Sequence, residues 1–188
     1  MKITKKSLIN IYRIRNYNTY NNILGEQVDD FFDWFRLKSK KYRFDKDHDA
    51  IELPDTFIPE LGKCYKNSQY YHFYGSFQYF EGFTSFLENS TRFINHAFNV
   101  ENTSLKDFTY YYNREEVIRW MGNAPDFHVG IIIPPNIMVE IFENLDIDVE
   151  ETRTNISLSI SLLIAYYIID SGLDLDIGNF KDPVEDIN

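Results

Sequence analysis

The chain has 188 residues, of which 44% are hydrophobic and 17% aromatic, and this composition excludes a globally disordered protein. Its formal net charge of −10 excludes strong overall attraction to nucleic acid. The single cysteine excludes an intramolecular disulfide, and no apolar signal segment follows the basic N-terminus, so we expect a cytoplasmic protein. We expect one domain over residues 1–188, with an acidic tail at 173–188 that is only partly ordered.

The N-terminal segment is expected to form regular structure. Residues 7–17 fit an amphipathic helix, but the spacing of their isoleucines also fits a strand. Apolar residues then recur at threes and fours over 21–38, with acids at the start and bases at the end. This order suits the helix dipole and predicts an amphipathic helix.

The next stretch is expected to contain a loop and then a long helix. Residues 44–69 are predicted to form the loop, because Pro54 and Pro59 interrupt regular structure. Apolar positions then keep to one helical face from 77 to 98, which predicts the helix. Gly82 lies within this range and weakens the prediction, because glycine disfavours a helix interior.

The following region alternates helix and strand signals. Residues 113–121, with Asn113 as N-cap and Gly122 at the end, predict a short helix. The β-branched run 127–133 predicts a buried strand. The Pro-Pro pair that follows ends this strand and begins a helix that runs to Asn144.

The last predicted elements complete the expected fold class. Residues 145–149 alternate as a half-exposed strand. Residues 155–172 have the end signals of a buried helix, although alternation over 156–162 leaves a strand open. The most apolar part, 156–169, is too short to span a bilayer, so no membrane partner is expected. The expected fold is α+β and helix-rich, with several amphipathic helices packed with a small sheet; an all-α fold is the alternative.

Local motifs for metals, cofactors and catalysis are missing from the sequence. The acidic run 45–49 imitates a calcium loop, but Ala50 and Thr56 stand where such a loop needs Gly and Glu. The chain has no phosphate-cradling glycine loop and no dinucleotide fingerprint. We therefore expect no cofactor, no metal site and no enzyme activity.

The histidines and the cysteine are isolated candidates for chemistry. His48, His72, His96 and His128 have no ligand spacing, and we expect His72 and His128 to be packed in the core. Cys64 could be a nucleophile paired with a distant histidine, but a structural role is favoured for a single free cysteine.

Charge is distributed unevenly along the chain. Residues 1–46 contain 11 Lys and Arg against 5 Asp and Glu, whereas residues 140–188 contain 12 acids and 2 bases. The acidic region is expected to attract basic proteins. Aromatics interleaved with bases in the first segment could bind nucleic acid or pair with the acidic half, and the overall acidity argues against nucleic acid.

Residues 130–149, GIIIPPNIMVEIFENLDIDV, resemble the strand–helix–strand ending of small uncharacterised bacterial domains encoded near toxin genes. The chain, which is small, acidic, rich in aromatics and poor in catalytic motifs, resembles bacterial immunity proteins, the cognate inhibitors of contact-dependent and other polymorphic toxins. The resemblance implies a non-catalytic protein that blocks the active site of a cognate, basic toxin. It carries over no functional residue.

The acids expected to meet the lysines and arginines of such a toxin are Glu140, Glu143, Asp146, Asp148, Glu150, Glu151, Asp174 and Asp176. Two other functions are open. One is an enzyme of an unfamiliar family that uses His and Asp or Glu, and the other is a structural or regulatory subunit. The sequence leaves open the identity of the partner and the oligomeric state.

Overall fold

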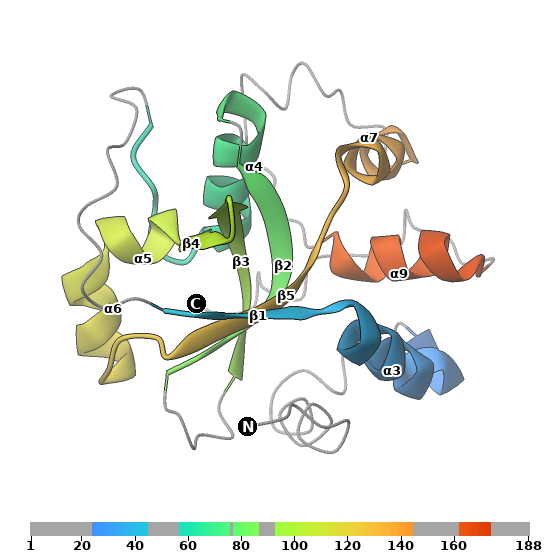
Figure 1. Cartoon of the computed structure of the whole chain (residues 1–188), viewed down its shortest axis with the longest axis horizontal. Coiled ribbons are helices and arrows are strands. Elements are labelled where there is room, and N and C mark those ends of the chain that lie inside the picture. The colour runs from blue at the N-terminus through green and yellow to red at the C-terminus, as the bar shows by residue number, and fades with distance from the viewer. Residues whose placement is uncertain (1–23, 45–56, 76, 87–92, 145–161, 174–188) are drawn as a thin grey trace.

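A computed structural model describes residues 24–44, 57–75, 77–86, 93–144 and 162–173 (Figure 1). In chain order, the elements are η1 (Gly25–Gln27), α3 (Val28–Lys38), β1 (Lys40–Arg43), α4 (Cys64–Tyr74), β2 (Gln78–Ser85), β3 (Phe93–Glu101), β4 (Ser104–Lys106), α5 (Phe108–Tyr112), α6 (Arg114–Met121), β5 (Phe127–Ile132), α7 (Pro135–Asn144) and α9 (Leu163–Ser171).

The centre of the described structure is a five-stranded antiparallel sheet with the order β1-β5-β2-β3-β4. Strands β2 and β3 pair along their length, from Gln78 opposite Val100 to Ser85 opposite Phe93. Strand β5 comes last in the sequence but lies between β1 and β2. The two edge strands, β1 and β4, also approach each other, so the sheet is curled.

Helices cover both faces of the sheet (Figure 1). One face packs with α3, α7 and α9 in a core that includes Phe31, Phe35, Tyr79, Phe83, Val129, Phe142 and Tyr167. The other face packs with α5 and α6 in a second core that includes Phe44, Phe80, Phe98, Val100, Leu105, Tyr110 and Val117. Helix α4 packs against β2 and β3. Because both faces are covered, β2 is buried from its second residue to its last.

The expected fold class needs correction. The predicted helix-rich packing around a small sheet is wrong, and so is the all-α alternative, because a five-stranded curled sheet organises the described structure. The fold is α+β, with helices laid on both faces of that antiparallel sheet. The fold class was mispredicted mainly because one segment of the chain was assigned to a helix instead of to two strands.

That segment is the predicted helix over 77–98, which is wrong. Its described parts form β2 and β3. A strand that is buried on both faces has no polar–apolar alternation, so its apolar residues matched helical spacing by coincidence. Gly82 was the opposing signal, and it lies in the middle of β2.

The predicted loop over 44–69 is wrong in its last part, because α4 begins at Cys64. This helix buries polar residues, among them Asn67, Ser68 and Gln69. It therefore lacks the apolar stripe by which an amphipathic helix is recognised in a sequence.

Several local predictions are confirmed. Helix α3 occupies the described part of 21–38, and β5 and α7 match the predicted strand and the helix after it. Helix α6 follows Asn113 and ends at Gly122, whose φ is 83°. The predicted elements at 7–17 and 145–149 and the tail at 174–188 lie outside the described residues.

The buried helix predicted over 155–172 is present where that range is described. Helix α9 has 9 residues and ends at Gly172, which adopts the left-handed conformation with φ of 64°. No helix in the described part of the chain is long and apolar enough to cross a bilayer.

Candidate active site

Four residues with chemically active side chains converge in the fold, although 64 positions separate the first from the last. Cys64 is the first residue of α4, and His96 lies on β3. Asp107 follows β4 and is the N-cap of α5, while His128 lies on β5. The antiparallel register of the sheet, and not any local spacing, brings them together.

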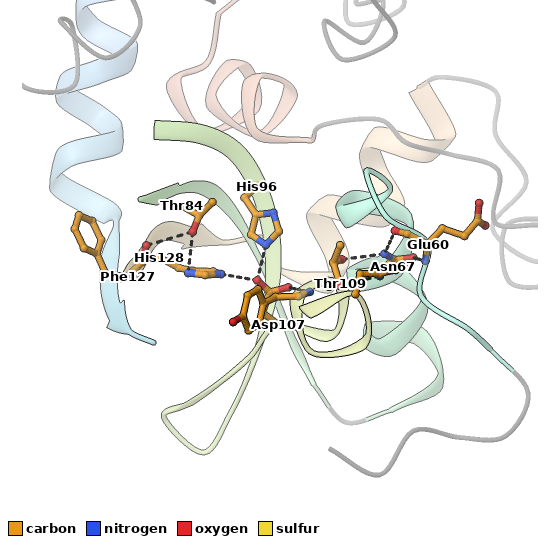
Figure 2. Close-up of polar contacts among 10 residues, drawn as sticks. Glu60, Asn67, Thr84, His96, Asp107, Thr109, Phe127 and His128 are labelled. Atoms are coloured by element: carbon orange, nitrogen blue, oxygen red, sulfur yellow. Dashed lines mark hydrogen bonds and ion pairs between the residues drawn. The ribbon is translucent and has the colours of Figure 1, made fainter. Parts of the chain in front are cut away.

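The Asp107 carboxylate is the centre of this cluster (Figure 2). Its Oδ2 accepts hydrogen bonds from Nε2 of His96 at 2.8 Å and from Nε2 of His128 at 2.7 Å. Its Oδ1 accepts from the Tyr110 backbone N–H at 3.0 Å, as an N-cap residue does. Asp107 is only 1% exposed, so these three bonds compensate for the burial of its charge.

The two histidines lie on neighbouring strands on either side of β2. His96 pairs with Gly82, and His128 pairs with Thr84, two residues further along the same face of β2. The two imidazole rings pack edge to face with centroids 5.0 Å apart. A Cβ on Gly82 would collide with the carbonyl of Val129 on the paired strand β5, so the close approach of the two strands requires glycine at this position.

The protonation states follow from burial and neighbouring charge. Burial lowers the pKa of His96, but the charge of Asp107 and the neighbouring Cys64 outweigh burial and raise this pKa to about 10. Burial would raise the pKa of Asp107, but His96 and the hydrogen bond from His128 hold it well below its usual range. Burial lowers the pKa of His128. At neutral pH the cluster therefore contains a His96 cation, an Asp107 anion and a neutral His128.

Cys64 completes the cluster. It lies beside His96 and, after Asp107, is the neighbour that raises the pKa of this imidazole. Because Nε2 of His96 donates to Asp107, Nδ1 is the nitrogen left for the thiol. The three groups therefore stand in the order thiol, imidazole, carboxylate, which is the order of a nucleophile, a base and the group that orients the base.

Cys64 is the first residue of α4, so it lies at the positive end of the helix dipole. The N-cap residue Lys63 has no side-chain hydrogen bond to the helix. Within the described part of the chain, the backbone N–H of Cys64 makes no hydrogen bond to another backbone group. The first N–H groups of a helix lack acceptors inside the helix and carry a partial positive charge.

Asn67 joins the start of α4 to the turn that carries Asp107. Its Nδ2 donates to the Glu60 carbonyl at 2.8 Å and to Oγ1 of Thr109 at 2.9 Å, and its Oδ1 accepts from the Glu60 N–H at 3.1 Å (Figure 2). Asn67 is one helical turn after Cys64, and Thr109 is two residues after Asp107. This fully buried amide therefore fixes the position of the thiol relative to the carboxylate.

His96, Asp107 and His128 are also residue types that bind metal ions. The donor atoms of His96, Asp107 and His128 lie within 4.8 Å of one another, and two imidazoles with one carboxylate are a common zinc ligand set. Both Nε2 atoms, however, lie at hydrogen-bond distance from the same oxygen, so each carries a hydrogen. A ligating nitrogen must be bare, and the observed contacts therefore fit a hydrogen-bonded cluster better than a metal centre.

Of the acids predicted to bind a toxin, the structure describes only two. Glu140 and Glu143 are exposed and lie about one turn apart on α7. Asp146, Asp148, Glu150, Glu151, Asp174 and Asp176 lie outside the described residues.

No signal in the sequence brings the histidines, Cys64 and Asp107 into one site. His128 is fully buried as expected, but its ring is part of the polar cluster. His72 is not part of the cluster. Its Nδ1 lies 2.7 Å from the Phe77 carbonyl oxygen instead. Asp107 had no local signal, because it precedes a helix of only five residues.

Comparisons with known proteins give no family for the chain: no family model, curated protein or solved structure matches it.

Proposed function

We propose that this protein is a thiol-dependent acyl-transfer enzyme in which Cys64 is the nucleophile. The proposal is carried by the placement of Cys64 beside His96, an imidazole whose Nε2 donates to the buried Asp107 carboxylate. The substrate class is a carbonyl compound with a leaving group, such as a thioester, an ester or an amide. Of the functions left open by the sequence, this site favours the enzyme over the immunity protein.

The first half of the reaction follows from the charges. The thiolate is the nucleophilic form of a cysteine, and a neighbouring imidazolium favours it. In the proposed step the Cys64 sulfur attacks the carbonyl carbon of the substrate and forms a tetrahedral intermediate. When the intermediate collapses, the bond to the leaving group breaks, and the His96 imidazolium donates its proton to that group.

The second half regenerates the enzyme. His96, now neutral, accepts a proton from water or from an acceptor amine or alcohol, which attacks the thioester carbonyl. The bond to the Cys64 sulfur breaks, the acyl group leaves with the acceptor, and the thiolate and the imidazolium are restored. Throughout, Asp107 stabilises the imidazolium and keeps Nε2 of His96 as the nitrogen that donates to it.

The start of α4 fits the charge that develops in this reaction. A tetrahedral intermediate places negative charge on the former carbonyl oxygen, and backbone N–H groups stabilise such an oxyanion. In the proposed reaction the N–H of Cys64, at the positive end of α4, donates to this oxyanion.

The test is to trap the acyl-enzyme. The purified protein would be incubated with a panel of small activated thioesters, esters and amides, and its intact mass would be measured. We expect one acyl group per chain, located on Cys64 by peptide mapping, and none on the Cys64→Ser variant. Acylation of wild type that persists in H96Q at the same rate would contradict the proposal.

A second proposal is that the protein neutralises a basic toxin in a reducing cytoplasm. It is supported by the net charge of −10 and by the exposed position of Glu140 and Glu143 on α7. A stoichiometric inhibitor does not need its thiol, so Cys64→Ser would protect cells from the co-expressed toxin as well as wild type does. Charge reversal at both glutamates would weaken the complex, and unchanged affinity would rule out this face.

A further inference from the structure

The Asp107 carboxylate is held from two sides by two different histidines. His96 approaches from β3, and His128 approaches from β5 and donates from Nε2 to the same oxygen at 2.7 Å. His96 is the histidine whose pKa is raised by Asp107 and by Cys64. His128 is fully buried, so its role is confined to the partners inside the cluster.

The hydrogen bond to Asp107 determines the tautomer of His128. A neutral imidazole that donates from Nε2 has an acceptor at Nδ1. Oγ1 of Thr84 lies 3.2 Å from this Nδ1 and 3.4 Å from the Phe127 carbonyl oxygen (Figure 2). The hydroxyl has one hydrogen to donate, and Nδ1 is the nearer of these two acceptors, so we assign the hydrogen bond to Nδ1. The Thr84 side chain is almost completely buried.

Aromatic packing fixes the plane of the His128 ring. The Phe44 ring stacks against it at 6.0 Å with an interplanar angle of 18°, and the Phe98 ring contacts it edge-on at 5.0 Å. The ring therefore offers its Nε2–H in one direction, toward Asp107.

We infer that Thr84 and His128 form a hydrogen-bond relay that holds the Asp107 carboxylate in the orientation in which it accepts the proton of His96. This makes His128 a positioning residue, which acts on Cys64 only through Asp107 and His96. The inference rests on the proposed thiol chemistry of Cys64.

The charges of the cluster agree with this role. The groups that face His96 are Asp107, Cys64 and the His128 ring, and those that face His128 are Asp107 and His96. A neutral His128 donates to the carboxylate without adding a second positive charge beside it. The negative charge of Asp107 therefore remains available to His96, which needs it to stay protonated.

The experiment measures the second-order rate of Cys64 alkylation by iodoacetamide between pH 5 and 9. Thr84→Val removes the hydroxyl and keeps the shape, whereas Thr84→Ser retains the hydroxyl and is the matched control. We expect T84V to slow alkylation at pH 7 by about tenfold and to change its pH dependence, as loss of an outer-shell hydrogen bond does at other sites, and T84S to behave as wild type. His128→Phe should slow the reaction at least as much.

Thermal unfolding of each variant would be recorded beside the rates to show which variants fold. If H128F does not fold, the comparison of T84V with T84S still tests the inference. The inference is overturned if T84V reacts as wild type does, or if T84S is slowed as much as T84V. The proposed function has its own control in the same assay: if H96Q reacts as fast as wild type, the thiol chemistry itself is wrong. Wild-type behaviour of T84V beside a slow H96Q overturns only the relay.

Discussion

His96 donates from Nε2 to Oδ2 of Asp107 at 2.8 Å, in a position where the carboxylate is almost completely buried and the imidazole nearly so. An ion pair removed from water in this way needs both members, since either charge alone would be strongly disfavoured. The same pair sets the charge of the histidine beside Cys64, so it connects the stability of the fold with the chemistry of the thiol.

Replacing Asp107 with Asn should lower the pKa of His96 far below its wild-type value of about 10. The amide keeps the size of the side chain but has no charge to oppose the burial that disfavours the imidazolium. The pKa would be measured from the imidazole resonances during an NMR titration. A His96 pKa that stays near 10 in D107N would show that Asp107 is not its main partner.

The stability of the protein should depend on pH through His96. Because the pKa of this group is raised on folding, its stabilisation is fully present below pH 6.5 and is lost as pH rises toward about 10. We expect the difference in unfolding free energy between wild type and H96Q to shrink by a few kcal/mol over this range, measured by urea denaturation. A difference that is constant with pH would contradict the assigned charge of His96.

Gly82→Ala should be severely destabilising, because the added Cβ would collide with the backbone of β5 at Val129. Neither strand can move without breaking the ladder that holds both histidines, so we expect a loss of about 3 kcal/mol or more. Gly25→Ala is the matched control: nothing lies within 4 Å of its added Cβ, and only the left-handed φ of 53° opposes it. That variant should lose about 1–2 kcal/mol. Equal losses of unfolding free energy in the two variants would show that β2 and β5 are not tightly packed at Gly82.

Asn67→Ala should reduce both stability and thiol reactivity. It leaves the Thr109 hydroxyl and the Glu60 backbone without their partner in a buried site, which costs about 2–4 kcal/mol. The neighbouring Lys66→Ala removes a partly exposed ion pair with Glu60 and a long cation–π contact with Phe57, and it should cost less than about 1 kcal/mol. Alkylation of Cys64 would be measured on both variants. Full reactivity in folded N67A would mean that this amide does not position the thiol.

Removal of divalent metal should leave the protein unchanged. Both Nε2 atoms of the cluster already donate hydrogen bonds to Asp107, so the cluster does not need a metal ion to neutralise its charge. We expect dialysis against EDTA to change neither the melting temperature nor the alkylation rate of Cys64. About one equivalent of zinc in the purified protein, with a fall in melting temperature when it is removed, would identify a metal centre instead.

The parts of the fold that could be predicted are those with signals in their own sequence. Helix α6 has a C-terminal glycine in the left-handed conformation, and α7 begins at Pro135, the second proline of the pair that follows β5. Strand β2 could not be recognised, because burial on both faces removes the alternation that reveals a strand. Helix α4 was missed because the partners of its buried polar residues come from distant segments, as Thr109 does for Asn67.

The site was harder to predict than the fold for a related reason. Cys64, His96, Asp107 and His128 come from one helix, two strands and a turn, and no short motif contains two of them. Only the pairing of β2 with both β3 and β5 places the histidines on one face. Cys64 was considered as a nucleophile with a distant histidine, but the sequence could not say which histidine or which acid.

The central claim is that His96 activates Cys64, and the pH dependence of Cys64 alkylation tests it most directly. An unassisted thiol loses about tenfold in rate for each pH unit below neutrality, because the thiolate disappears. We predict that the rate for wild type falls less steeply from pH 8 to pH 6 than the rate for H96Q, because the pKa of His96 is raised to about 10 and its cation stays beside the sulfur throughout this range. Identical profiles for the two proteins, or a wild-type thiol that does not react in the folded state, would contradict the account.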